Sequence, residues 1–282
     1  MSYLHGMSMP YTKDWEDLTI RDNFLFLKVM SNEAICRLFL EKLLRICIRE
    51  LHFLQTEKTV EQGLSAKAIR LDIYVEDDAG RIYDIEMQTT NRKEDALGLR
   101  TRYYQSVLDQ HALAKGEDYI KLRETYIIFI CTFDPFRDGL ARYTFRSRCI
   151  EDPDLELEDR ACRIFLNSTA LSRDVDDDIT GLLQYINSNT ASGGLAEKVA
   201  IEVNQLKARR TVQEEYMNLA REIQREIYRE KDVLLEQGRV EGRVEASRDI
   251  ALRFLQNGIS PEQVAMGTGL SLEEIRKLQP VQ

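Results

Sequence analysis

The sequence predicts a mixed α/β fold, in the order helix, three strands, helix, strand, with a helical C-terminal extension. Three patterns support this prediction. Apolar residues recur at helical spacing in two segments, and they alternate in two segments that a turn joins. A further apolar run is continuous and has the length of a strand.

The first helix is expected over residues 33–48, with a short strand after it over residues 50–55. The apolar residues of the helix follow the i, i+3, i+4 pattern of an amphipathic helix, and they are Ile35, Leu38, Phe39, Leu43 and Ile46.

Residues 68–75 and 81–89 are expected to form an antiparallel hairpin. A three-residue turn, Asp78-Ala79-Gly80, would join them, with Gly80 in the left-handed conformation. Asp72 then faces Glu86, the apolar residues share one face, and the acids share the other. A slip of one residue would mix the two faces, so the pattern itself supports this register.

The second helix is expected over residues 94–113 and the fourth strand over residues 125–132. Residues 126–130 are all apolar, which is typical of a strand buried on both faces.

The hairpin carries the candidate chemistry, because it places two carboxylates directly opposite each other. Two such carboxylates repel each other and destabilise the hairpin. A divalent cation between Asp72 and Glu86 would make the arrangement favourable, because it attracts both charges. Mg²⁺ would also polarise a phosphoryl oxygen and lower the pKa of a bound water. Gln88 projects from the same side as Glu86, two residues along the strand. The alternative is a solvated hairpin face, on which acids are common.

Composition and cysteine spacing argue against a membrane protein, a secreted protein and a zinc finger. With 43% hydrophobic and 31% charged residues, the chain has the composition of a soluble globular protein, and it holds no apolar run long enough for a membrane. Five widely spaced cysteines without a Cys-x-x-Cys fit reduced thiols, and no export signal is seen, so we expect a cytoplasmic protein. The net charge of −9 weighs lightly against a nucleic-acid partner and leaves a local basic surface open.

A polar, turn-rich stretch over residues 174–194 is the expected boundary between two domains, 15–172 and 195–282. The second domain is rich in Glu and Arg, as in an exposed helix, and either a dimer seam or a passive helix fits it. Its end holds two helix N-caps, Ser260 and Ser271, in a helix-turn-helix-like pair. Such a pair could enter a DNA groove or bind a protein partner.

The motif residues together resemble a known family. The stretches 70–73 and 84–88 (Arg-Leu-Asp-Ile and Asp-Ile-Glu-Met-Gln) resemble the Asp…Glu-x-Lys core of the PD-(D/E)XK nucleases. With Arg100 and the Arg-Tyr-Tyr of 102–104, they look like the Rpn branch, the recombination-promoting nucleases and related transposases. Asp22-Asn23-Phe24, residues 116–119 and Glu-Gly-Arg at 241–243 fit the same branch.

The resemblance implies a restriction-endonuclease-like αβββαβ core that hydrolyses DNA phosphodiester bonds with Mg²⁺ or Mn²⁺. Asp72 and Glu86 match the family's metal ligands, with the Met87 carbonyl as a third candidate. Glu41 matches a helical acid of some branches, a role that Glu33 fits nearly as well. Leu71 replaces the nominal Pro, and Gln88 replaces the Lys, so it would orient the attacking water without adding a charge.

Arg100 and Tyr104, on the second helix, would contact a phosphate and donate a hydrogen bond near the cleavage site; helix surface and core packing are the competing interpretation. We therefore expect a metal-dependent DNA endonuclease linked to recombination or a mobile element, with a homodimer left open. A catalytically weak DNA-binding or scaffold protein with the same fold is the alternative. A generic α/β protein without metal affinity is the third interpretation.

Overall fold

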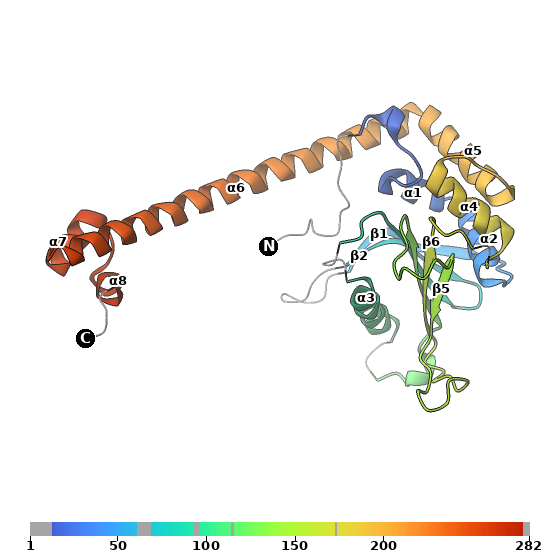
Figure 1. Ribbon diagram of the computed structural model, residues 1–282. Coiled ribbons are helices and arrows are strands. Elements are labelled where there is room, and N and C mark those ends of the chain that lie inside the picture. Colours follow the sequence, from blue (N-terminus) through green and yellow to red (C-terminus); the bar gives the residue numbers. More distant parts are fainter. Residues whose placement is uncertain (1–12, 61–68, 93–95, 114–115, 173, 279–282) are drawn as a thin grey trace. The chain divides into compact units, whose positions relative to one another are not determined.

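The computed structural model describes residues 13–60, 69–92, 96–113, 116–172 and 174–278. Contacts divide the chain into two compact units, Met1–Tyr216 and Met217–Gln282. We describe each unit by itself (Figure 1).

The first unit is built on a six-stranded sheet in the order β1-β2-β3-β4-β6-β5. Strands β1, β2 and β3 are antiparallel, β3, β4 and β6 run parallel, and β5 is antiparallel to β6. The strands are β1 (Leu51–Val60), β2 (Ile69–Asp77), β3 (Ile82–Gln88), β4 (Thr125–Cys131), β5 (Arg142–Phe145) and β6 (Ala161–Asn167). Among the described residues, all seven positions of β4 are buried, as its apolar run predicts.

Helices cover both faces of this sheet. One apolar cluster joins one sheet face to α1, α2, α4 and α5, and a second joins the other face to α3 (Figure 1). The helices of the unit are η1 (Trp15–Asp17), α1 (Asn23–Met30), α2 (Glu33–Leu44), α3 (Leu97–Ala112), η3 (Tyr119–Lys121), α4 (Asp177–Ser188) and α5 (Gly194–Ala208). The order helix, three strands, helix, strand is confirmed as α2, β1, β2, β3, α3, β4.

The predicted hairpin register is confirmed. Tyr74 pairs with Asp84, and Ile73 pairs with Ile85. The Asp77 amide donates to the Arg81 carbonyl across the turn, and Gly80 has a φ of 77°. The expected starts of β2 at Ala68 and of α3 at Glu94 lie outside the described residues.

Two element ends differ from the prediction. Helix α2 stops at Leu44 rather than near residue 48, because Arg45 takes the left-handed conformation with φ 56°. Strand β1 continues to Val60, five residues beyond the expected end, through a bulge between Phe53 and Gln55. Apolar periodicity does not report where a chain leaves a helix or adds a bulge.

The turn-rich stretch of residues 174–194 contains helix α4 and the start of α5. The polar residues of this stretch lie at the ends of the two helices. Asp176 caps α4, Asn189 ends it in the left-handed conformation, and Gly193 precedes α5. Both helices bury apolar residues in the cluster that α2 shares, so they belong to the first unit. The domain limits 15–172 and 195–282 stay a prediction about which parts fold independently.

In the second unit the long helix α6 (Arg210–Gln256), which begins in the first unit, leads into α7 (Pro261–Thr268) and α8 (Leu272–Lys277). A small core of Ala251, Val264, Leu270 and Ile275 holds the end of α6 to the helix pair. Both predicted caps are present, and Ser271 forms a full capping box with Glu274. No helix of the described residues is long and apolar enough to cross a membrane.

Candidate active site

The candidate site lies on the sheet face that α3 covers. Because side chains alternate along a strand, β3 turns Asp84, Glu86 and Gln88 to this face, and Asp72 of β2 joins them. All four residues are buried, with exposed fractions of 9% for Asp72, 0% for Asp84, 2% for Glu86 and 5% for Gln88. The alternative of a solvated hairpin face is therefore wrong.

Asp72 and Glu86 lie against each other, as the hairpin register predicts. The Asp72 amide donates to Glu86 Oε1 at 3.2 Å, and the Met87 amide donates to Asp72 Oδ2 at 3.4 Å. These two backbone N–H groups offset part of the repulsion between the carboxylates, because a carboxylate that accepts a hydrogen bond is stabilised in its charged form. The strand pairing therefore holds two carboxylates at one place.

Arg100 of α3 reaches into this pair. Its Nη2 donates to Glu86 Oε2 at 2.5 Å, its Nη1 donates to Gln88 Oε1 at 2.8 Å, and its Nε donates to Tyr104 Oη at 3.1 Å. The guanidinium also lies over the Phe129 ring at 4.8 Å. The structure thus brings together Asp72, Glu86 and Gln88 with the two supporting residues Arg100 and Tyr104.

Glu41, the other supporting candidate, lies elsewhere. It belongs to α2, whose buried residues are part of the cluster on the opposite sheet face. Its Oε1 accepts a hydrogen bond from the Ile48 amide at 2.8 Å, just after the helix ends. A structural role in the loop after α2 accounts for this glutamate.

Asp84 is a member of the cluster that the motif comparison does not assign to the site. It is fully buried, and neither carboxylate oxygen has a hydrogen-bond partner among the residues that the structure describes. Burial raises the pKa of Asp84 well above its usual value, and the charges of Glu86 and Asp72 raise it further. The alternation of residues 84, 86 and 88 along the strand is the signal that could have found it.

Burial also raises the pKa of Glu86, and Arg100 opposes that shift. A buried carboxylate is costly unless a cation or hydrogen bonds compensate it. Arg100 supplies one such cation to Glu86. The Asp84 carboxylate, by contrast, accepts no hydrogen bond within the described part of the chain.

The donor chemistry fits a hard divalent cation. Carboxylate oxygens are the ligands that Mg²⁺ takes from proteins, usually one or two, with waters filling the other positions. Buried Asp84 adds a third carboxyl group to this cluster, with two oxygens that no hydrogen bond of the described residues satisfies. Among the described residues, no group of three or more His, Cys, Asp or Glu side chains is arranged to hold an ion. Asp72 and Glu86 are the two carboxylates of this cluster that lie in contact through a hydrogen bond.

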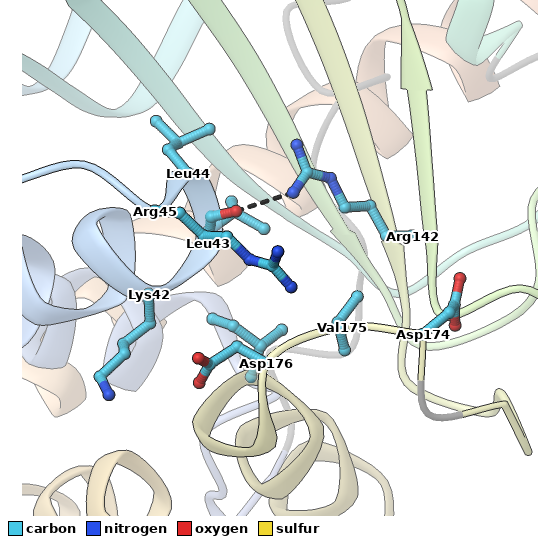
Figure 2. Close-up of a pocket in the computed structure, with 9 residues that line it drawn as sticks. Lys42, Leu43, Leu44, Arg45, Arg142, Asp174, Val175 and Asp176 are labelled. Atoms are coloured by element: carbon cyan, nitrogen blue, oxygen red, sulfur yellow. Dashed lines mark hydrogen bonds between the residues drawn. The ribbon is translucent and has the colours of Figure 1, made fainter.

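A separate cavity of about 290 Å³ lies beside the C-terminal end of α2, the start of β5 and the segment that enters α4 (Figure 2). Arg142 Nη1 donates to the Leu43 carbonyl at 2.7 Å there, and Lys42 pairs with Asp178 at 2.8 Å. None of the clustered acids Asp72, Asp84 and Glu86 lines it. This cavity is not part of the candidate site.

The strand order, the helical layers and the paired acids of β2 and β3 define a restriction-endonuclease-like fold of the PD-(D/E)XK class. Residues 23–231 match the family described as PD-(D/E)XK nuclease family transposase, and the chain belongs to this family. Residues 244–280 match the C-terminal HTH domain of the Rpn/YhgA-like nuclease family. Both matches confirm the resemblance that the motif residues predict. No curated protein and no solved structure matches the chain significantly.

Proposed function

We propose that the protein is a metal-dependent DNA endonuclease that hydrolyses phosphodiester bonds in the cytoplasm and serves recombination or a mobile element. The observation that carries this proposal is the buried pair Asp72 and Glu86, which follows the Ile73–Ile85 pair of β2 and β3 and is joined by the hydrogen bond from the Asp72 amide to Glu86 Oε1. A divalent cation would offset part of the cost of burying two carboxylates side by side, and membership of a nuclease family supports a metal at this place.

In this proposal Asp72 and Glu86 hold Mg²⁺, or Mn²⁺, with the Met87 carbonyl as a further ligand. The ion when bound would polarise a phosphoryl oxygen and lower the pKa of a water. Gln88 would orient that water by accepting from it at Oε1, because its Nε2 donates to the Thr90 carbonyl at 2.8 Å and so fixes the plane of the side-chain amide. Tyr104 fixes the helix face that α3 presents to the acids, since its ring is buried and its hydroxyl accepts from Arg100.

DNA is the proposed partner of both units. The nuclease family supports this for the first unit, and the HTH match supports it for the helix pair α7 and α8. Helix α8 offers Arg276 and Lys277 in its last turn, although Lys277 pairs with Glu273 at 2.9 Å. A homodimer would supply the two active sites that cleavage of both strands requires.

Plasmid nicking tests the proposal. Purified protein is incubated with supercoiled plasmid in Mg²⁺, Mn²⁺ or EDTA, beside Asp72→Ala and Glu86→Ala, with circular dichroism to confirm folding. We expect nicking by the wild type with metal only, and at least a roughly 100-fold lower rate for each variant. Equal activity of folded wild type and both folded variants would refute the two-carboxylate site.

A second candidate is a DNA-binding or scaffold protein that keeps the nuclease fold with little catalysis. Gln88 favours it, because the PD-(D/E)XK motif has Lys at this place, and Gln brings no charge to the phosphate. This candidate predicts DNA binding that is unaffected by Asp72→Ala and Glu86→Ala, and no nicking by any of the three proteins.

A further inference from the structure

The positive charge absent from residue 88 is present nearby on another element. The PD-(D/E)XK motif, after which the matched family is described, has a lysine two residues after the second acid, where this chain has Gln88. The Arg100 guanidinium lies at the end of that very side chain, with Nη1 2.8 Å from Gln88 Oε1. Its Nη2 contacts Glu86 at the same time. One cation from α3 therefore lies beside both residues of the motif.

The surroundings hold Arg100 in a fixed position. Its Nε donates to Tyr104 Oη, one helical turn along α3, and its guanidinium lies over the rings of Phe129 and Tyr104 at 4.8 and 5.3 Å. Phe129 is itself placed opposite Glu86 by the parallel pairing of β3 and β4. The side chain of Arg100 is 23% exposed, so one part of it stays open to a ligand.

A lysine at residue 88 would not fit beside this arginine. The Gln88 carbonyl oxygen accepts a hydrogen bond from Arg100, whereas an ammonium group there would place two cations together. Glutamine at 88 and arginine at 100 are thus a matched pair. If Arg100 were only a counter-ion for Glu86, it would not need the hydrogen bond to Gln88 as well.

We propose that Arg100 supplies the electrostatic stabilisation of the scissile phosphate that the motif lysine supplies elsewhere, with Gln88 as its positioning residue. This inference rests on the proposed nuclease function. In the reaction, the water oxygen bonds to phosphorus and gives up one proton to solvent, the bond from phosphorus to the bridging sugar oxygen breaks, and that oxygen takes up a proton from solvent. Arg100 keeps its own protons and stabilises the negative charge on the phosphate oxygens, where a planar guanidinium binds well.

A charge-relocation experiment tests this role. Single-turnover nicking rates and DNA affinities are measured for Arg100→Gln, Arg100→Lys and the double variant Gln88→Lys/Arg100→Gln. Arg37→Gln is the matched control: it removes an arginine of α2 whose Nη1 donates to the Arg49 carbonyl, away from the site. We expect Arg100→Gln to lower the rate about 100-fold and DNA affinity far less. The double variant should nick at least tenfold faster than Arg100→Gln. The rate of Arg100→Lys should lie between those of Arg100→Gln and the wild type, and the rate of Arg37→Gln should equal that of the wild type.

Two controls separate the inference from the proposed function. Thermal unfolding is measured on every variant, and Asp72→Asn reports whether the nicking comes from this site. If the wild type nicks and Asp72→Asn does not, but Arg100→Gln keeps its rate, only the role of Arg100 is overturned. The same holds if the double variant regains stability without rate, because Arg100 is then a counter-ion for Glu86. If the wild type does not nick, the proposed function fails and the inference fails with it.

Discussion

At the residue scale, the site shows what strand pairing makes predictable. Asp72 and Glu86 could be paired from the sequence, because alternation and one turn set the register of a hairpin. The Arg100 contacts could not be derived this way. They depend on how α3 lies across the sheet, and helical periodicity does not report that orientation.

Asp84 gives a residue-scale prediction with a definite pH dependence. Because its pKa is raised in the folded protein, the native state keeps a proton that the unfolded chain releases near pH 4. Its contribution to stability therefore falls as the pH rises from about 4 towards the raised pKa. Asp84→Asn should raise the free energy of unfolding by about 1–3 kcal/mol at pH 8 and by little at pH 4.

Urea unfolding in EDTA at pH 4, 6 and 8 measures this difference. Asp138→Asn, at an exposed position, is the control and should change stability by less than about 0.5 kcal/mol throughout. A gain for Asp84→Asn that does not grow with pH would show that the buried carboxyl is compensated.

At the element scale, the periodic patterns locate the helices and strands better than their ends. The hairpin is predictable because Asp-Ala-Gly between two alternating segments is a turn signal with a physical cause. The end of α2 is not, since Arg45 adopts the left-handed conformation that glycine or asparagine usually takes. Polar residues at 174–194 suggest a boundary, although they cap packed helices.

The hairpin turn yields a prediction at this scale. Gly80 has φ 77°, and apart from its chain neighbours no atom of the described residues lies within 4 Å of the place that a β-carbon would occupy, so a side chain there meets backbone strain and no clash. Gly80→Ala should therefore lower the free energy of unfolding by about 1 kcal/mol, and Gly80→Asn by less. Gly98, in helix α3 and also in open space, is the control: Gly98→Ala should raise stability by up to about 1 kcal/mol. Chemical denaturation compares them, and equal effects at both positions would contradict the assigned turn.

At the scale of the whole molecule, the fold class and the family could both be predicted from the sequence, and both are confirmed. The division of the chain was harder to predict, because α4 and α5 add to the sheet unit through buried apolar residues spread along a polar-looking sequence. Composition alone does not show which helices pack against a sheet. The net charge of −9 likewise gives no indication of the HTH domain that residues 244–280 match.

Calorimetric titration of Mn²⁺ into the full chain tests the central claim, a divalent-metal site made by Asp72 and Glu86, independently of catalysis. Asp72→Asn and Glu86→Gln keep side-chain size and remove one ligand charge each, and Asp138→Asn is the control. We predict one site in the wild type and in the control, with affinity at least tenfold lower in both ligand variants. Equal Mn²⁺ affinity in all four folded proteins, or no binding by the wild type, would contradict the claim.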